Sequence, residues 1–505
     1  MRHGKIICVI VIGLTITPTA DAITQWGPYV TGTTTDSTII NWRTNNETFG
    51  GRVKYTTKEY YESNMDYEYS ISDNSIRQNH KLVLTDLIPD TLYYYQLEIG
   101  DQSTDLFSFR TFPNEGSSFS FIVYGDTREE LPLFTQQERH KLVADMISQE
   151  GEISFVIHTG DLVSDGGDLK SWDGFFDAGK EMMANTTFYP VLGNHEKNNS
   201  IYYEAFGVPD WYSFYCGDAH FTMLDSNDWA DISEETTWLE EDLTSNSRFK
   251  FVTFHHPPYS SDQRHWGGWE NVREFWEDLF IESGVDAVFS GHVHTYERYH
   301  INKVHYIVLG CGGAPMYQLS VEKIPGYQNS MESCLGYARI TVKEDEAKME
   351  VIKVADISKE DGSITNVYPP NTIFETLILE EVLDRGMLRV TANVEIPMVG
   401  IDLNRSKIDY GEVVAGDQSE NETIKIVNRG SSEVRITLDV VAASHEEQDF
   451  YEESLYINNN LYNQANITSS IPSDDSEDVI TQLRIPTEWG IISKYDANFV
   501  FWAEA

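Results

Sequence analysis

The spacing of apolar positions changes twice along the chain and divides it into three segments. From residue 23 to about residue 114, apolar residues alternate with polar ones in short runs between turn residues. The clearest run puts six residues on one face: Leu87, Pro89, Thr91, Tyr93, Tyr95 and Leu97. Period-two runs of this kind predict strands with one buried face. This segment is therefore predicted to be a β-sandwich.

The middle segment, residues 115–383, contains continuous apolar runs that alternate with stretches of helical period. Strands are expected at 119–124, 153–158, 187–192, 249–254 and 285–289, and helices near 133–149, 169–184 and 269–282. Apolar strands separated by helices indicate sheets covered by helices, an α/β layer architecture. In such folds the chemistry gathers on loops at the carboxyl ends of strands.

The last segment, residues 384–505, alternates again. Val434, Ile436, Leu438 and Val440 share a face, and residues 428–431 predict the turn before them. The apolar run 499–502 predicts a terminal strand held within a sheet. The segment is predicted to be a second β-sandwich, and we treat it as accessory because its sequence shows no cluster of metal-ligand or catalytic residue types.

The first 22 residues differ from everything that follows. Arg2 and Lys5 precede the apolar run 6–16, which ends in small residues and the triplet Ala20-Asp21-Ala22. This order predicts a secretory signal peptide over residues 1–22. Later apolar runs are too short to cross a bilayer. The expected location is therefore outside the cytoplasm, secreted or at the cell surface.

Charge and cysteine content restrict the possible partners. The formal net charge of −45 opposes electrostatic capture of nucleic acid or of an anionic membrane. A site for an anionic substrate must then supply its own positive charge. Cys216, Cys311 and Cys334 are too few for a disulfide framework. One bridge, Cys311 to Cys334, with a buried thiol beside it, is left open.

Five loops of the middle segment place metal-ligand side chains directly after an apolar strand. They are Gly125-Asp126-Thr127-Arg128, Gly160-Asp161-Leu162-Val163-Ser164, Gly193-Asn194-His195-Glu196, Phe254-His255-His256-Pro257 and Gly291-His292-Val293-His294. A single loop of this kind is common at the end of a strand, since glycine lets the chain turn sharply. Five in series indicate a metal centre.

The series resembles the calcineurin-like metallophosphoesterases, and most closely the purple acid phosphatase branch. Residues 291–298 and Gly312-Gly313-Ala314-Pro315 add to the likeness. The run from Leu87 to Tyr95 is similar to the fibronectin type III-like sandwiches that usually precede the catalytic domain in that branch. The resemblance implies a fibronectin type III-like β-sandwich (23–114) and a central αββα metallophosphoesterase sandwich (115–383). The C-terminal β-sandwich (384–505) matches no family that we recognise.

Carried over by residue, the resemblance implies two transition-metal ions, with Fe, Mn, Zn and Ni all suited to mixed His, Asp and Asn ligands. Asp161 bridges the ions, Asp126 and His294 bind the first, and the second has three ligands of its own: Asn194, His255 and His292. His195 is expected to bind substrate or protonate the leaving oxygen. His265, with Arg264 beside it, falls near another substrate-contacting position.

Two positions depart from the family pattern. Ser164 stands where the purple branch has a tyrosine ligand, and Arg128 stands where most other members of the superfamily have a histidine. The first metal keeps Asp126, Asp161 and His294. His140 is a candidate replacement, although a packed or exposed histidine is the favoured interpretation. We expect Arg128 to contact phosphate or to orient Asp126, because its fork matches oxyanion geometry.

Several neighbours of these loops have plainer interpretations. His158 is expected to be a core histidine and His256 a scaffold residue, while Trp266 and Trp269 either wall a pocket or pack at a helix start.

The leading hypothesis is a secreted binuclear-metal enzyme that hydrolyses small phosphate monoesters with metal-activated hydroxide. The alternatives are a phosphodiesterase or nucleotidase on the same site, and a non-catalytic cell-surface binding protein with a decayed phosphatase domain. The oligomeric state is left open.

Overall fold

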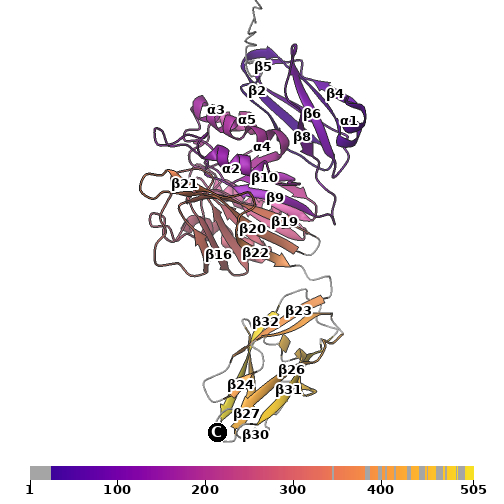
Figure 1. Cartoon of the computed structure of the whole chain (residues 1–505), viewed down its shortest axis with the longest axis vertical. Helices are drawn as coiled ribbons and strands as arrows, with labels where there is room; N and C mark the ends of the chain where they lie inside the picture. Colours follow the sequence, from indigo (N-terminus) through magenta and orange to yellow (C-terminus); the bar gives the residue numbers. More distant parts are fainter. Residues whose placement is uncertain are drawn as a thin grey trace, which may run out of the picture. The chain divides into compact units, whose positions relative to one another are not determined.

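The computed structural model describes residues 24–343 and 346–381, followed by separate stretches of the C-terminal region (387–395, 401–403, 407–414, 417–428, 434–442, 450–451, 453–461, 470–471, 475–484, 486 and 495–504). The predicted signal peptide lies outside the described residues. The chain forms two compact units, residues 1–380 and 381–505 (Figure 1). The predicted fold class is confirmed, because a β-sandwich, a layered α/β domain and a further all-β unit follow one another. Among the described residues, no helix is long and apolar enough to cross a membrane.

The N-terminal domain is a sandwich of two antiparallel sheets. One sheet contains β1 (Trp26–Thr31), β2 (Thr38–Phe49) and β5 (Ile76–Leu84). The other contains β3 (Arg52–Thr57), β4 (Tyr69–Ser72), β6 (Leu92–Ile99), β7 (Gln102–Ser103) and β8 (Phe107–Arg110), and α1 (Lys58–Asn64) follows β3. The alternating residues fill the core, as their period predicts, since Ile40 and Trp42 of one sheet and Tyr93, Tyr95 and Leu97 of the other are buried together.

The central domain contains two seven-stranded sheets. The first has the order β11 (Thr187–Pro190), β10 (Phe155–His158), β9 (Phe119–Tyr124), β19 (Cys334–Val342), β20 (Glu346–Ile357) and β21 (Ile364–Val367), with β22 (Ile373–Glu381) also paired to β20. The second has the order β12 (Tyr212–Cys216), β13 (Ala219–Met223), β14 (Phe249–Thr253), β15 (Ala287–Ser290), β17 (Val304–Leu309), β16 (Tyr296–Ile301) and β18 (Tyr327–Met331). The sheets pack face to face, because Phe121 of β9 contacts Phe221, Phe251 and Phe289 of the second sheet.

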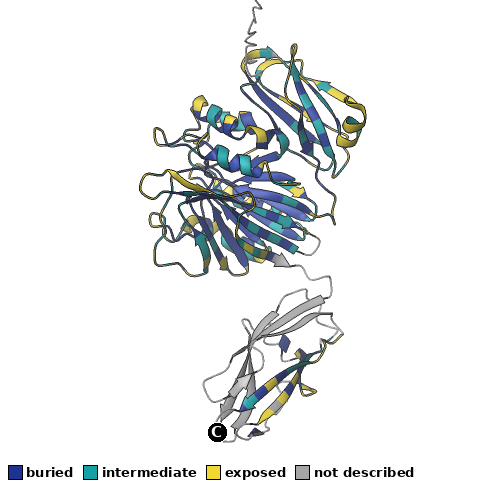
Figure 2. Ribbon diagram, viewed as in Figure 1, coloured by how far each residue is buried: buried dark blue, intermediate teal, exposed yellow. Residues whose placement is uncertain are grey.

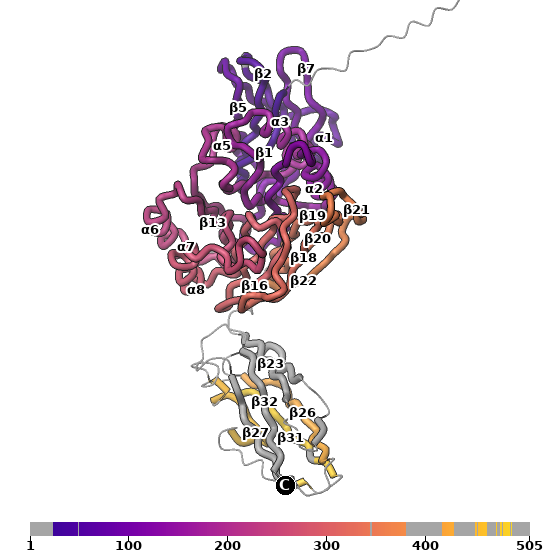
Figure 3. Tube along the Cα trace, turned by 90° about the vertical axis from the view of Figure 1, so that its left-hand side faces the viewer, coloured from indigo at the N-terminus to yellow at the C-terminus, as the bar shows by residue number. Residues whose placement is uncertain are grey.

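Helices cover the outer faces of both sheets. Against the first sheet pack α2 (His140–Ile147), α3 (Leu169–Ala178), α4 (Lys180–Asn185) and α5 (Ser200–Phe206). Against the second pack α6 (Ile232–Asp242), α7 (Glu270–Val272) and α8 (Asp278–Glu282), which gather on one side of the domain (Figure 3). The strands between these helices are largely buried (Figure 2). This is the predicted αββα arrangement.

The helices are shorter than their periods predict. The stretch 169–184 breaks at Gly179, where α3 ends and α4 begins. In the stretch 133–149, only His140–Ile147 is helical, because residues 130–138 form hydrogen-bonded turns. The stretch 269–282 contains a π-helical turn at Arg273–Glu277 between α7 and α8.

The N-terminal sandwich packs directly against the central domain. The ring of Trp26 stacks on Phe176 with centroids 4.6 Å apart. The Tyr29 hydroxyl donates to the Ala205 carbonyl at 2.6 Å, and the Tyr95 hydroxyl donates to the Ala184 carbonyl at 2.7 Å. Tyr95, which was predicted as core, therefore also anchors the sandwich to α4, and Tyr29 anchors it to α5.

In the C-terminal unit, the described strands form two five-stranded sheets. One has the order β25 (Lys407–Val414), β23 (Met387–Glu395), β32 (Tyr495–Glu504), β27 (Val434–Ala442) and β30 (Ser470–Ile471). The other has the order β24 (Ile401–Leu403), β26 (Glu422–Asn428), β31 (Ser476–Leu483), β28 (Leu455–Ile457) and β29 (Asn460–Leu461). The terminal strand pairs on both sides, as its apolar run predicts. Residues 429–431 of the predicted turn lie outside the described residues.

Among the described residues, Cys216, Cys311 and Cys334 are buried free thiols. Cys311 and Cys334 lie next to each other, and a hydrogen bond between the thiols raises the pKa of Cys334 together with burial. The bridge that the sequence left open is not formed.

Candidate metal centre

All five predicted loops lie at strand carboxyl ends. They follow β9, β10 and β11 of the first sheet and β14 and β15 of the second. Because β9–β11 are parallel, as are β14 and β15, the loops of each sheet emerge at one edge. The packing of the two sheets then brings the edges together, and the backbone N–H of His292, in the loop after β15, donates to Asp126, in the loop after β9 of the other sheet. Within the edge of the second sheet, the N–H of Gly291 donates to the carbonyl of His255.

Three of the predicted ligands have left-handed backbones. The φ angles are 57° at Asp126, 54° at Asp161 and 64° at His292. Such angles are uncommon for residues other than glycine and concentrate at functional sites, where the surrounding structure holds them.

Neighbouring glycines allow the loops to lie in contact. A Cβ atom at Gly193 would lie 2.2 Å from the Asp161 backbone nitrogen, and one at Gly291 would lie 2.3 Å from Asp126 Oδ2. Any larger residue at these two positions would force the carboxylates of Asp126 and Asp161 apart from the loops that face them.

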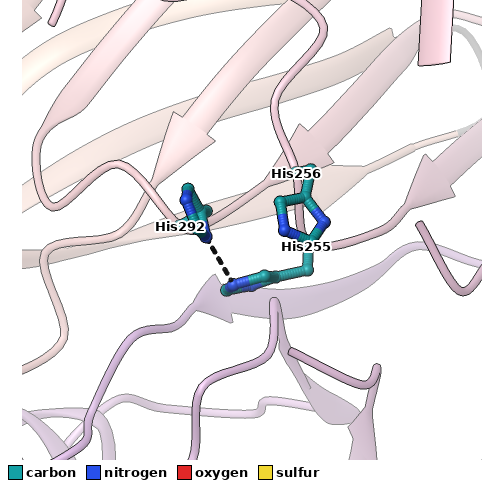
Figure 4. Close-up of side chains that lie close together, drawn as sticks. All are labelled: His255, His256 and His292. Atoms are coloured by element: carbon teal, nitrogen blue, oxygen red, sulfur yellow. Dashed lines mark hydrogen bonds between the residues drawn. The ribbon is translucent and has the colours of Figure 1, made fainter. Parts of the chain in front are cut away.

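The ligands expected for the second metal ion are Asn194, His255 and His292, and their donor atoms converge on one point. Asn194 Oδ1 lies 2.9 Å from His292 Nδ1 and 3.1 Å from His255 Nε2, and the two ring nitrogens are 3.1 Å apart (Figure 4). The Nδ1–H of His255 donates to the Thr159 carbonyl at 2.8 Å, which leaves Nε2 as the free donor. His256 also lies within ligand distance of His255 and His292, although its Nδ1 hydrogen bonds with Ser226.

The group expected to bind the first metal ion contains Asp126, Asp161 and His294, whose donor atoms lie within 4.8 Å of one another. His294 Nδ1 is hydrogen bonded to the Pro315 carbonyl, so Nε2 faces Asp126 Oδ1 at 3.4 Å. Asp161 belongs to both groups, because its Oδ1 also lies 3.4 Å from His255 Nε2. This is the position that a bridging carboxylate requires.

The electrostatics of the centre fit bound cations. Burial and the neighbouring Asp161 raise the pKa of Asp126 well above its usual range. Burial lowers the pKa of His294 to about 3 and the pKa of His292 further, so these rings are neutral at pH 7. Buried carboxylates beside neutral imidazoles and an amide oxygen are a donor set for divalent transition metals.

The predicted substrate-contacting residues surround this centre. His195 Nδ1 is hydrogen bonded to the Ser164 carbonyl at 2.8 Å, and its Nε2 lies 3.9 Å from Asp161 Oδ2. Arg128 Nε lies 3.8 Å from the same carboxylate oxygen and has no hydrogen-bond partner among the described residues. The His265 ring lies 5.0 Å from that of His292, between centroids.

Of the other residues singled out in the sequence, Trp269 lies at the centre, whereas His140, Ser164 and Trp266 are not placed as ligands. Both nitrogens of the buried His140 ring are hydrogen bonded, to Tyr124 and Gln136, so His140 has no free nitrogen to replace the missing ligand. The Ser164 hydroxyl donates to Glu129 at 2.6 Å. Trp266 is 53% exposed, whereas Trp269 walls the centre with its ring 4.5 Å from that of His292.

Sequence reasoning missed Tyr317. Its ring stacks on His294 with centroids 4.1 Å apart, and the Arg264 guanidinium lies over it at 4.7 Å. The only local signal is that Tyr317 follows Pro315, in the stretch already matched to the family. Glu196 accepts four backbone N–H groups of two ligand loops.

Glu235 of α6 braces the adjoining loop and gives a pH prediction. Its Oε1 accepts the backbone N–H of Asp225 at 2.7 Å, and burial raises its pKa to about 9. Between about pH 4.5 and 9 the folded state therefore holds a proton that the unfolded state releases. This lowers the free energy of unfolding by about 1.4 kcal/mol for each unit of pH rise.

The substitution Glu235→Gln is expected to remove this slope. Urea unfolding of both proteins at pH 5, 6, 7 and 8 measures it, and the variant gains stability relative to the native chain as pH rises. If the free energies of unfolding of the native chain and of Glu235→Gln change in parallel between pH 5 and 8, the pKa of Glu235 is not raised.

Similarity to known proteins agrees with this geometry. Residues 119–296 match the family model "Calcineurin-like phosphoesterase", and residues 25–111 match "Purple acid Phosphatase, N-terminal domain". A phosphoenolpyruvate phosphatase of Allium cepa is 27% identical over 53% of this chain and 61% of its own length. A probable purple acid phosphatase of Arabidopsis thaliana is 29% identical over 52% of this chain and 66% of its own length. The chain thus spans less than two thirds of these relatives.

Solved structures show the same fold. The purple acid phosphatase PPD1 from yellow lupin seeds superimposes with a TM-score of 0.57 at 18% identity, over 68% of this chain and 74% of the lupin chain. The structure of PhoD gives a TM-score of 0.56 at 12% identity, over 72% and 93% of the two chains. Together with the metal-ligand loops, these matches show that the chain carries a calcineurin-like metallophosphoesterase domain preceded by a purple acid phosphatase N-terminal domain.

Proposed function

We propose that the protein is a secreted, binuclear-metal phosphoesterase that hydrolyses small phosphate monoesters. The observation that carries the proposal is the position of Asp161, which lies within ligand distance of both donor groups. Phosphate esters are anions, and a chain with a net charge of −45 needs a local cation source to hold them. The signal-like sequence of residues 1–22 supports secretion.

The residues divide the work as follows. Asp126 and His294 would hold one metal ion, Asn194, His255 and His292 the other, and Asp161 both. Bound there, the ions supply positive charge for the phosphoryl oxygens and lower the pKa of an attacking water. His195, oriented by the Ser164 carbonyl, keeps Nε2 towards the site and delivers a proton to the leaving oxygen. His265 and Trp269 form the walls of the space that the substrate would occupy.

Metal analysis with matched assays tests this function. The purified protein is stripped with a chelator, reloaded with Mn, Zn, Fe or Ni, and assayed with p-nitrophenyl phosphate and bis-p-nitrophenyl phosphate. We expect up to two metal ions per chain and faster monoester hydrolysis. Faster diester hydrolysis would favour the phosphodiesterase alternative. If the protein binds less than one metal ion per chain and hydrolyses neither ester with any metal, the alternative of a non-catalytic protein with a decayed phosphatase domain is favoured.

Arg128 is proposed to bind the phosphoryl group. Its side chain is 12% exposed, and its ion-pair distances are long, with Nη1 3.6 Å from Glu130 and Nε 3.8 Å from Asp161. Substituting Arg128→Ala is expected to lower kcat/KM for p-nitrophenyl phosphate by about 10- to 100-fold, because a charge-assisted contact to the phosphoryl oxygens is lost. Steady-state kinetics measures the effect. Arg128→Lys should recover part of it, and unchanged KM and kcat in the alanine variant would rule out this role.

A further inference from the structure

Arg264 is an unpaired cation in an acidic protein. The chain has 36 basic and 81 acidic residues, and most described arginines form ion pairs or donate to carbonyls. The side chain of Arg264 is exposed, and among the described residues no carboxylate lies within ion-pair distance of it. Its guanidinium instead lies over the ring of Tyr317, 4.7 Å from the centroid.

The tyrosine connects this cation to the metal centre. Tyr317 stacks on His294 with centroids 4.1 Å apart, and the Arg264 guanidinium lies 4.7 Å from the centroid of the same ring. One aromatic ring therefore contacts both Arg264 and a candidate metal ligand. His265, the next residue, lies beside both Tyr317 and His292.

Paired loops hold this arrangement in place. Asp262 forms a β-bridge with Leu319, and the backbone N–H of Gln263 donates to the Gln318 carbonyl at 2.9 Å. The buried Asp262 carboxylate accepts the backbone N–H of Arg264 at 2.9 Å. The backbone positions of Arg264 and Tyr317 are thus fixed relative to each other, although the guanidinium itself reaches solvent.

We propose that Arg264, supported by Tyr317, forms a leaving-group subsite that selects phosphate esters whose leaving group carries a second anionic group, a carboxylate or a phosphate. This inference rests on the proposed phosphoesterase function. With the phosphoryl group at the metal centre, the leaving group of a small ester would extend from the centre towards the residues beside His294, among which are Tyr317 and, over its ring, Arg264. A guanidinium fork matches a carboxylate or phosphate at that point, and the acidic surface elsewhere repels it.

Matched substrate pairs test the subsite. The first pair is 3-phosphoglycerate and glycerol 3-phosphate, which differ by a carboxylate, and the second is fructose 1,6-bisphosphate and fructose 6-phosphate, which differ by a phosphate. For each pair the ratio of kcat/KM values is measured in the metal-loaded native protein, Arg264→Ala, Arg264→Lys and Lys81→Ala. Lys81 is an exposed cation of the N-terminal sandwich and controls for net charge.

The native protein is expected to prefer, in at least one pair, the member whose leaving group carries the additional anionic group. Arg264→Ala should reduce that ratio by about three- to tenfold, as expected for an exposed charge-assisted contact, and Arg264→Lys by less. Loss in the first pair alone identifies a carboxylate, and loss in the second alone a phosphate. An absent preference, or an equal loss in Lys81→Ala, overturns the subsite.

Binding gives a readout that does not need turnover. Titration calorimetry of the metal-loaded protein with 3-phosphoglycerate and with glycerol 3-phosphate should show a three- to tenfold affinity difference that Arg264→Ala removes, a range expected for one exposed charge-assisted contact. If the native protein hydrolyses no ester, the proposed function fails, while the binding difference still decides the subsite. If it hydrolyses esters without such a difference, the subsite alone fails.

Discussion

Replacing Asp161 by asparagine is expected to lower kcat/KM for p-nitrophenyl phosphate by at least about a hundredfold and to reduce the bound metal. Asp161 is 2% exposed, and its Oδ1 lies 3.4 Å from His255 Nε2 while its carboxylate also lies among the atoms of Asp126 and His294. An amide keeps the shape but offers one neutral oxygen, so it cannot give a charged oxygen to each of two ions.

Metal content distinguishes loss of a bridge from loss of one site. Elemental analysis of Asp161→Asn should show occupancy falling at both positions, whereas Asn194→Ala should spare the Asp126 side. Asp165→Asn is the matched control, because Asp165 lies on the same loop but pairs with exposed Lys197. Full metal content with full activity in Asp161→Asn would exclude a bridging role.

The candidate ligand loops could be located in the sequence because each follows an apolar strand with polar side chains of metal-ligand type, and four of the five also contain a glycine. What the sequence did not show is how the loops meet. The left-handed backbones of Asp126, Asp161 and His292 have no sequence signature, since these residue types adopt ordinary conformations elsewhere. Tyr317 was missed for a similar reason: it reaches His294 through the packing of two loops that are far apart in sequence order.

The fold followed the same division. Period-two runs placed the buried residues of the N-terminal sandwich correctly, because burial of one face produces that period directly. Helix ends were less predictable. Gly179 divides the predicted helix 169–184, and a single glycine in a helical pattern is often tolerated, so the sequence alone favours one continuous helix.

Glu196 should be as important for the centre as the ligands, although it touches no metal position. Its Oε2 accepts the backbone N–H groups of Asp161 at 2.9 Å and Gly193 at 2.7 Å. Its Oε1 accepts those of Leu162 at 2.9 Å and Val163 at 3.2 Å. One fully buried carboxyl group thereby fastens the Asp161 loop to the Asn194 loop.

Substituting Glu196→Gln is expected to cost about 2–6 kcal/mol in free energy of unfolding of the metal-free protein, since two buried N–H groups lose their acceptor at about 1–3 kcal/mol each. The amide NH2 also points at those donors, which pushes the loops apart. Metal affinity, measured by chelator competition, should fall by about 10- to 100-fold because Asp161 and Asn194 lose their relative position.

Glu240→Gln is the control for this substitution, because Glu240 lies on the exposed face of α6 and its change should leave both quantities unaltered. Urea unfolding followed by tryptophan fluorescence gives the stability of each variant. A loss of stability without a loss of metal affinity would mean that the loops keep their spacing through Gly193 and the N–H of His195, which donates to Asp161 Oδ1 at 3.0 Å. Unchanged stability of the metal-free protein would show that the four N–H groups do not depend on Glu196.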